Sequence, residues 1–381
     1  MVHSYYASRQ PSGENIVVDL QIEALRRAGH AVEVVARRTD DLEHARTYPV
    51  TAALRVASGR GASPRAQIES FAPDVAHVHN LFPNFGRRWA LQPGPPLIAT
   101  LHNYRPMCPA GTLFRDGASC TLCPDDDDAR HAVIHACYKD SKLATWPVAR
   151  ATKFGADPLL TAAGRIFTLN DDMREQYAAI GVPADKLVTV PNFVPDPGES
   201  GQHDGDYWLY VGRLSREKGI LQLLGQWPDG HRLKVAGAGP LEAEVAAAAG
   251  PSVELLGQVA SERVRELLAG AKGLVFPSLW PEGLPTVYLE ALAAGTPVLA
   301  SPESVVGRLV ADQGTGLVHR GTLTDDLAEA DRLFPRLHER CRTTFADSYT
   351  EAAWLRAVEG HYRDVIATRA STLRGNSPRH L

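Results

Sequence analysis

The feature that most constrains the fold of this chain is an alternation of short, β-branched apolar runs with segments of helical periodicity. A helix between two strands returns the chain across a sheet, so this order predicts strands that pair in parallel. The alternation occurs in two sets, separated by a polar, Gly-rich stretch at residues 196–201. The chain has 381 residues, more than the roughly 250–300 at which a single core stops growing. The sequence therefore predicts an α/β protein of two Rossmann-like domains, each with a doubly wound parallel sheet.

The apolar runs also give the expected strands and domain limits. We expect strands at residues 2–5, 31–36, 75–78, 97–101 and 165–169 in the first set, and at 208–211, 233–236, 253–256, 273–276 and 297–300 in the second. We place an N-terminal domain at 1–190 and a C-terminal domain at 191–348. Residues 349–367 have helical spacing, and the polar tail at 368–381 is expected to be disordered.

Composition limits the partners and the compartment. The formal net charge is -4, which argues against a dedicated nucleic-acid partner, because such proteins carry an excess of basic residues. No apolar run reaches the ~20 residues of a membrane span. The N-terminus lacks the charged and apolar regions of a signal peptide, so we expect a cytoplasmic protein with reduced cysteines.

A basic loop follows the first strand of the second set. Arg213 and Lys218 lie on this loop, where a helix is expected to begin. Two cations beside a helix N-terminus suit a diphosphate, because guanidinium, ammonium and backbone N–H groups all face the anion. A solvated charged loop is the plain alternative, since basic loops are common.

Two carboxylates flank another helix start, after the fourth strand of the second set. Glu282 lies before this helix and Glu290 inside it, with Pro285 suited to the first helical position. Gly283 and Leu284 offer free backbone N–H groups at the positive end of the helix. Such carboxylates could accept hydrogen bonds from sugar hydroxyls and from a ribose diol. An ordinary helix-terminal glutamate and a surface glutamate are the alternatives.

Glu282 and Glu290, with seven residues between them, resemble the E-x7-E signature of retaining, family-4-like glycosyltransferases of the GT-B fold. The adjoining segments Pro281–Pro285 and Ala291–Val298, and the Val211–Leu214 stretch, are similar to the same bacterial enzymes. The resemblance covers nearly the whole chain. It implies two domains that face each other across a cleft, an insertion at about 103–140 in the first, and a helix at about 349–367 that completes the first.

The resemblance also implies a nucleoside-diphosphate sugar as the donor, with a UDP-sugar as the commonest case. The donor-binding residues would be Arg213 and Lys218 at the diphosphate, Glu282 with Gly283, Leu284 and Pro285 at the sugar, Glu290 at the ribose, and Gly257 and Val259 at the nucleobase.

On the first domain, the resemblance points to Gly13 and His102. Gly13 belongs to a turn, Pro11–Glu14, that would face the phosphates and the acceptor, although family members often carry Gly-Gly where this chain has Ser12. His102 follows an expected strand and would meet the transferring sugar. The expected catalytic residues are therefore His102, Glu282, Arg213 and Lys218.

The implied reaction is transfer of a hexose or a related sugar with retention of configuration. The acceptor would be a hydroxyl of a glycan, a lipid-linked compound or a small molecule. Arg213 and Lys218 would replace a catalytic metal. A nucleotide-sugar epimerase of the same architecture and a non-catalytic nucleotide-sugar-binding protein remain alternatives. A nicotinamide-dependent dehydrogenase is disfavoured, because no G-x-G-x-x-G follows a strand.

Four cysteines cluster within the insertion. The spacing of Cys120 and Cys123 is typical of structural zinc sites, and four thiolates could hold zinc tetrahedrally. Buried thiols without metal are equally compatible with this spacing. The tentative zinc ligands are Cys108, Cys120, Cys123 and Cys137, with His131 or His135 as substitutes.

Two charged features are expected to be solvated. The acidic run Asp125–Asp128 lies in a polar loop rather than at metal-ligand spacing. Arginines gather early in the chain and could make a peripheral contact with the inner face of a membrane, although scattered arginines are more often solvated. These are Arg37, Arg38, Arg46, Arg55 and Arg60.

Overall fold

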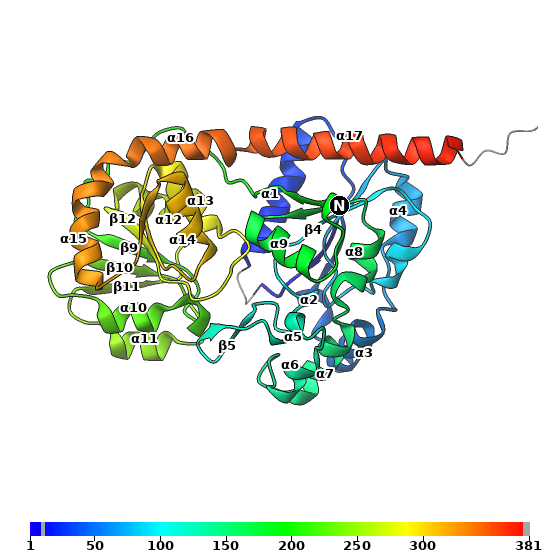
Figure 1. Ribbon diagram of the computed structural model, residues 1–381, viewed down its shortest axis with the longest axis horizontal. Coiled ribbons are helices and arrows are strands. Elements are labelled where there is room, and N and C mark those ends of the chain that lie inside the picture. Colours follow the sequence, from blue (N-terminus) through cyan, green and yellow to red (C-terminus); the bar gives the residue numbers. More distant parts are fainter. Residues whose placement is uncertain (9–11, 376–381) are drawn as a thin grey trace, which may run out of the picture. The chain divides into compact units, whose positions relative to one another are not determined.

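The computed structural model describes residues 1–8 and 12–375, the last four as backbone only. The chain divides into two compact units, shown in Figure 1. Unit 1 comprises Met1–Thr112, Thr121–Pro191 and Trp354–Leu381, and unit 2 comprises Leu113–Cys120 and Asn192–Ala353.

Unit 1 is built on a six-stranded parallel sheet with the order β2-β1-β3-β4-β7-β8. The chain runs from β1 outward to β2 and then back past β1 to β3. Open parallel sheets bind ligands at such a reversal, beyond the carboxyl ends of the strands. The strands are β1 (Val2–Tyr5), β2 (Val35–Arg38), β3 (Ala76–Asn80), β4 (Leu97–Thr100), β7 (Arg165–Thr168) and β8 (Leu187–Thr189).

Unit 2 repeats this plan with the order β11-β10-β9-β12-β13-β14, again with parallel pairs. The reversal of strand order falls between β9 and β12. A small antiparallel hairpin pairs β5 (Phe114–Arg115) with β6 (Ala118–Ser119). The sheet strands are β9 (Trp208–Val211), β10 (Leu233–Ala236), β11 (Val253–Gly257), β12 (Gly273–Phe276), β13 (Val298–Ala300) and β14 (Gly316–Val318).

Helices connect the strands in both units, and those of unit 2 lie on both faces of its sheet in Figure 1. In unit 1 they are α1 (Gly13–Arg27), α2 (Thr39–Leu42), α3 (Tyr48–Ser58), α4 (Arg65–Phe71), α5 (Leu122–Asp125), α6 (Arg130–Ile134), α7 (Lys142–Ala151), α8 (Pro158–Ala162) and α9 (Asp171–Ala179). In unit 2 they are α10 (Ile220–Gln226), α11 (Glu242–Ala248), α12 (Ser261–Gly270), α13 (Thr286–Ala294), α14 (Val305–Gln313), α15 (Leu323–Leu333) and α16 (His338–Ser348).

The last helix, α17 (Glu351–Gly375), returns the chain to unit 1. It buries Val358 and Val365. Its Tyr362 hydroxyl shares a 2.7 Å hydrogen bond with Nδ1 of His77 on β3. The helix continues past the expected end at residue 367, so residues 368–375 of the expected disordered tail are helical. Residues 376–381 lie outside the described part of the chain.

The predicted fold class is confirmed, with two parallel-sheet α/β units. Several expected strands, such as β9 and β12, have the predicted bounds. β2 starts at Val35 rather than at residue 31, and its arginines pair with β1, Ser4 with Arg37 and Tyr5 with Arg38. The sequence did not indicate the edge strands β8 and β14, which are three residues long and partly exposed.

Candidate active site

The loops after β9, β10 and β12 of unit 2 meet through glycine. A Cβ at Gly237 would collide with the Gly212 carbonyl oxygen, and the backbones of the first two loops bond from Leu214 N–H to the Ala238 carbonyl (3.0 Å). Gly219 has a φ of +69° and approaches the Pro277 carbonyl so closely that a side chain there would clash. Glycine is required where backbones approach this closely, so these positions bring the basic loop against the loop of Glu282.

Lys218 and Glu282 form an ion pair as a result of this packing. Nζ of Lys218 lies 2.6 Å from Oε2 of Glu282, and the Ser278 hydroxyl donates to Oε1 at 2.5 Å. The Leu279 N–H donates to the Glu217 carbonyl (2.9 Å), which holds the two loops together. The Glu282 side chain is only 7% exposed and that of Lys218 is 21% exposed. The structure thus brings Lys218 and Glu282 into contact. The sequence predicted both residues for one site, Lys218 at the diphosphate of the donor and Glu282 at its sugar.

Arg213 differs from Lys218 in its surroundings. Its side chain is exposed, and among the described residues it forms no ion pair. Its backbone is fixed, because the Tyr210 hydroxyl donates to its carbonyl at 3.0 Å. A guanidinium on a fixed backbone, with no carboxylate partner, remains available to an anion.

The predicted helix start after Glu282 is present, with a shift of one residue. Pro285 is the N-cap, α13 runs from Thr286 to Ala294, and Gly295 caps its C-terminus with a φ of +78°. Gly283 and Leu284 are buried beside Glu282. Glu290 lies in the middle of α13, where burial raises the pKa of its carboxyl and Arg265 of α12 opposes that rise.

Glu290 lines a small cavity of about 70 Å³ with Pro195, Pro197 and Arg265. Gly257 ends the edge strand β11 with a φ of +66°, and its carbonyl accepts the Gly237 N–H at 2.8 Å. Val259 follows and is partly exposed. Both residues therefore lie at the carboxyl edge of the sheet, as a nucleobase contact would require.

In unit 1, His102 follows β4 and is held by a second histidine. Its Nε2 lies 3.0 Å from Nδ1 of His79 on β3, and the two rings stack at 5.3 Å. The other ring nitrogen of His79, Nε2, is buried without a partner among the described residues. A bare ring nitrogen tolerates this better than an N–H does. We therefore assign the shared proton to Nδ1 of His79, which leaves His102 with its own proton on Nδ1 as a donor.

Burial keeps this histidine cluster neutral. It lowers the pKa of His102 and of His77 to about 3 and that of His3 to about 4. The pKa of His79 is also well below its usual value, through burial and the adjacent histidines. The Nε2 atom of His77 bonds to the Thr100 hydroxyl at 2.7 Å. His102 is thus a neutral hydrogen-bond donor, and sequence reasoning missed its partner His79.

Gly13 is the first residue of α1 and is exposed; Ser12, the N-cap, makes no capping bond through its side chain. Pro11, the first residue of the predicted turn, lies outside the described residues. Glu14 follows Gly13 and reaches Asn103, the neighbour of His102, with a 3.2 Å hydrogen bond from Nδ2 to Oε2. The sequence placed Glu14 in the turn but gave no sign of its contact with the loop after β4.

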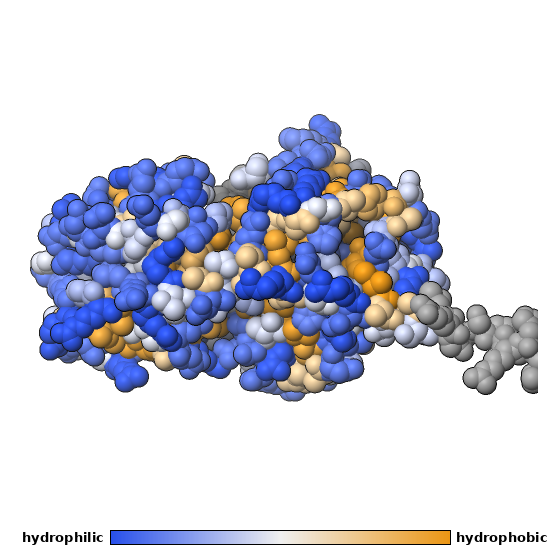
Figure 2. Space-filling view, turned by 90° about the horizontal axis from the view of Figure 1, so that it is seen from above, coloured by the Kyte–Doolittle hydropathy of each residue, from blue (hydrophilic) through white to orange (hydrophobic). Residues whose placement is uncertain are grey.

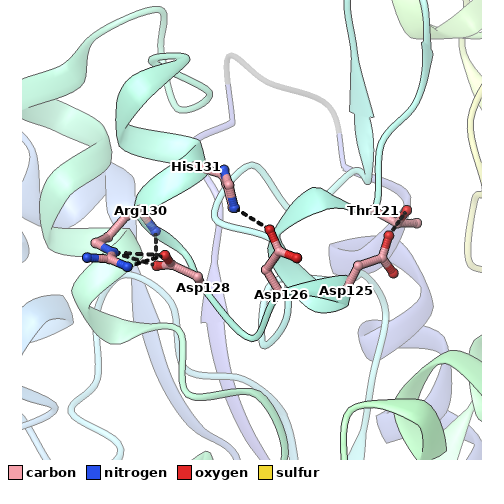
Figure 3. Close-up of polar contacts among 6 residues, drawn as sticks. All are labelled: Thr121, Asp125, Asp126, Asp128, Arg130 and His131. Carbon is pink, nitrogen blue, oxygen red and sulfur yellow. Dashed lines mark hydrogen bonds and ion pairs between the residues drawn. The ribbon is translucent and has the colours of Figure 1, made fainter.

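The predicted zinc site is not supported. No three His, Cys, Asp or Glu side chains are arranged to hold a metal in the described ranges. The substitute His131 bonds through Nε2 to Asp126 (2.7 Å; Figure 3). All the predicted ligands are thiols, with Cys123 buried at the start of α5 and the rest partly exposed: Cys108, Cys120 and Cys137.

The acidic run at 125–128 is paired locally rather than simply solvated. Figure 3 shows the Thr121 hydroxyl donating to Asp125 (2.6 Å) and Arg130 bonding to Asp128 through its Nε (2.8 Å). The contact with Arg130 lowers the pKa of the Asp128 carboxyl. Each of these contacts spans five residues or fewer, so they fix the turn between α5 and α6.

A membrane contact receives no direct support. Within the described chain, every helix falls short of the length and apolar character needed to span a bilayer. Three of the five arginines pack on the protein: Arg37 and Arg38 lie over the Phe85 and Tyr5 rings, at 5.9 Å and 4.0 Å. Arg55 donates to the Pro83 carbonyl at 3.2 Å. Figure 2 shows hydrophobic residues in separate groups among hydrophilic ones on the face it presents.

Comparison with known families agrees with this geometry. Residues 12–192 match the family model described as a glycosyl transferase 4-like domain. Residues 205–332 match the model described as glycosyl transferases group 1. The two models match adjoining parts of the chain, so most of the chain is similar to glycosyltransferase domains.

Curated relatives are similar over much of the chain. TuaC of Bacillus subtilis (strain 168), named as a teichuronic acid biosynthesis glycosyltransferase, is 25% identical over an alignment of 358 residues, with 81% of this chain and 82% of TuaC covered. The alpha-maltose-1-phosphate synthase of Mycolicibacterium smegmatis is 32% identical over an alignment of 222 residues, with 50% of this chain and 55% of the synthase covered.

Solved structures show the same fold. Sucrose-phosphate synthase from Thermosynechococcus elongatus superposes with a TM-score of 0.68 at 20% identity, covering 96% of both chains. HepE of Anabaena, solved in complex with UDP and glucose, superposes with a TM-score of 0.60 at 13% identity, covering 96% of this chain and 100% of HepE. These likenesses confirm the GT-B fold class.

Proposed function

We propose that this chain is a retaining glycosyltransferase that moves a hexose or a related sugar from a nucleoside-diphosphate sugar, a UDP-sugar in the first instance, to a hydroxyl acceptor. The acceptor would be a glycan, a lipid-linked compound or a small molecule. The Lys218–Glu282 pair carries this proposal, because it lies where the strand order of unit 2 reverses. The matches to two glycosyltransferase domain models and the UDP complex of HepE support it.

Lys218 and Arg213 would stabilise the departing nucleoside diphosphate. Fixed donors aimed at developing charge are often the largest catalytic term, about 3–4 kcal/mol each by analogy with oxyanion holes. Glu282 holds Lys218 in place and would accept hydrogen bonds from the donor sugar. Two cations beside a helix N-terminus supply the charge that a metal supplies in other transferases, so we propose that the reaction is metal-independent.

In the proposed transfer, the acceptor oxygen bonds to the anomeric carbon on the face that the diphosphate leaves. The bond from that carbon to the diphosphate oxygen breaks, and the hydroxyl proton passes to the departing diphosphate. No side chain forms a covalent intermediate in this scheme. His102 would donate a hydrogen bond from Nδ1 to the transferring sugar.

Donor binding is tested by thermal shift with UDP, GDP, ADP and dTDP. A nucleotide present at 100 times its dissociation constant should stabilise the protein by ~2.7 kcal/mol. Arg213→Ala should weaken binding of that nucleotide, whereas Arg216→Ala, which removes an exposed arginine from the same loop, should leave it nearly unchanged. Equal effects of the two variants, or no stabilisation by any nucleotide, would contradict the donor site.

Transfer is tested by incubating the protein with UDP-glucose and other nucleotide sugars, with and without a panel of alkyl glycosides and free sugars. The expected product keeps the anomeric configuration of the donor, as read from its ¹H NMR coupling constant. Epimerised nucleotide sugar in the absence of acceptor would establish the epimerase instead. Nucleotide binding with no turnover on any pair would favour a non-catalytic binding protein.

A further inference from the structure

The carboxyl edge of the sheet in unit 1 carries a carboxylate that the proposed donor chemistry does not use. Glu14, in the first turn of α1, accepts a hydrogen bond from Nδ2 of Asn103 on its Oε2 (3.2 Å). Asn103 directly follows His102 in the loop after β4. Glu14 and His102 therefore come from different elements to neighbouring positions at one edge of the sheet.

Asn103 is held firmly in its position. Its Oδ1 accepts the backbone N–H of Arg105 at 3.0 Å, and its carbonyl accepts the hydroxyl of the fully buried Tyr177 at 2.7 Å. Both contacts fix the amide so that Nδ2 faces Glu14. The carboxylate of Glu14 thus has one oxygen anchored and its orientation set.

The second oxygen of this carboxylate, Oε1, is buried and has no hydrogen-bond partner within the described ranges. Arg105 acts on Glu14 through its charge but forms no hydrogen bond with it: Nη1 and Nη2 donate to the Pro109 and Ala110 carbonyls, and Nε is buried without a partner among the described residues. A buried carboxylate oxygen without a donor costs free energy. A ligand that brings the missing donor would remove that cost, and the adjoining Gly13 is exposed.

We propose that Glu14 binds a hydroxyl group of the sugar acceptor through Oε1, beside His102. This inference rests on the proposed function and adds a residue to its acceptor side. An ionised carboxylate is an acceptor only, so it suits an incoming O–H, whereas a protonated one would present its own hydrogen. A hydroxyl supplies one donor and needs no counter-charge, which matches the single unfilled position on Glu14.

Glu14 titrates in the range where the enzyme can be assayed. Burial raises the pKa of its carboxyl to about 7, against the lowering influence of the Arg105 charge and of the nearby amides of Asn103 and Asn80. Tyr6, at the end of β1, also faces it, but burial raises the pKa of that phenol so that it stays neutral. Acceptor binding should therefore strengthen as the pH rises through 7.

The test compares Glu14→Gln with Glu23→Gln, which removes an exposed carboxylate from the same helix that pairs with the exposed Arg26. The acceptor is the hydroxyl compound of the panel to which the wild-type protein transfers. For the wild type, kcat/KM for acceptor should rise through pH 7. Glu14→Gln should lower it roughly 10- to 100-fold at pH 8, the effect of a hydrogen bond to a charged group, and should flatten the profile. UDP affinity should stay within about twofold of wild type, and Glu23→Gln should behave as wild type.

Glu14→Asp serves if Glu14→Gln fails to fold, since it keeps the charge on a shorter arm. It should retain the pH step and lose acceptor kcat/KM. The inference is overturned if the Glu14 variant that folds matches the wild type in acceptor kinetics and pH profile. It is also overturned if that variant weakens UDP binding as much as it lowers transfer. A wild-type chain that binds no nucleoside diphosphate and transfers to no acceptor would overturn the proposed function itself, which is a different result.

Discussion

The carboxyl edges of the two sheets differ in the charge of their polar groups: unit 2 has an ion pair, and unit 1 has a cluster of neutral histidines. In unit 2, Lys218 and Glu282 face each other as an ion pair at 2.6 Å. In unit 1, burial favours the neutral forms of His79 and His102 and raises the pKa of Glu14 to about 7. An edge that already holds charge is suited to a charged ligand such as a diphosphate. An edge with neutral histidines and a single carboxylate that titrates near pH 7 is suited to hydroxyl groups, which bring no charge of their own.

The largest expected difference between the units is in how much stability each loses at acidic pH. The folded-state pKa values of His3, His77 and His102 are about 4, 3 and 3, below the usual 6.5, so the unfolded chain binds protons that the folded one does not. Stability is therefore present above about pH 7 and is lost as the pH falls toward 4. At pH 5 the loss is on the order of 2 kcal/mol for each such histidine.

Hydrogen exchange at pH 7 and pH 5, corrected for intrinsic rates, measures this loss. Strands β1, β3 and β4 should lose more protection than β9, β10 and β12. A smaller loss is expected in unit 2, where burial also lowers the pKa of His203. Equal losses of protection in the two sheets would contradict the expected difference in acid sensitivity between the units.

The next largest effect concerns the ion pair of unit 2. Lys218→Met should reduce transfer by about 100- to 1,000-fold, because a donor aimed at the departing diphosphate is lost, and should destabilise the unit by leaving Glu282 buried without its cation. The double variant Lys218→Met/Glu282→Gln should regain stability but not activity.

Chemical denaturation and kcat measurements separate these two outcomes. Lys234→Met is the matched control, since its side chain is 18% exposed, against 21% for Lys218, and lies over the Tyr207 ring away from the loops of the site. A double variant that recovered transfer would show that the pair is structural only.

A smaller effect is expected from the histidine contact of unit 1. His79→Leu removes the donor that fixes the proton of His102 and should lower kcat roughly 10-fold, by about the free energy of one hydrogen bond. His79→Asn keeps an N–H at nearly the same place and should recover most of that loss. The ¹⁵N shifts of His102 report its proton position, and a ring protonated on Nε2 in the wild type would refute the assignment.

The smallest effect is expected from metal removal. With Arg213 and Lys218 providing the positive charge, exhaustive treatment with EDTA should leave the transfer rate within about twofold, since no ion is needed for the departing diphosphate in the proposed scheme. Restoration of lost activity by Mg²⁺ or Mn²⁺ would show that a cation is needed, and that Arg213 and Lys218 alone do not supply the positive charge.

The fold could be read from the sequence where strands are apolar and central. Trp208–Val211 and Gly273–Phe276 are buried runs, and their pattern is independent of what packs on them. β2 was placed too early because its pairing with β1 uses Arg37 and Arg38, which a hydrophobic pattern does not reveal. The edge strand β14 has one sheet neighbour and partly exposed residues, so its signal was weak.

The proximity of Lys218 and Glu282 could be predicted because both residues lie on loops at the carboxyl edge of one sheet. The contacts within unit 1 were harder to predict. His79 and His102 are 23 residues apart, and Glu14 and Asn103 are 89 apart, so their contacts depend on which strands are neighbours. The zinc prediction failed for a related reason, since cysteine spacing does not determine how the side chains are oriented.

The return of α17 to unit 1 affects how the protein is made. Unit 2 is complete in the nascent chain once Ala353 has been synthesised, whereas unit 1 needs Trp354 and the residues after it. At roughly 5–20 residues per second, the first sheet waits on the order of 10–40 s after Pro191 for the helix that covers His77. During that interval the apolar face that α17 covers is accessible to chaperones and to other nascent chains. Slowly translated codons for residues 192–353 should therefore increase aggregation of this protein more than slowly translated codons that follow those of the helix.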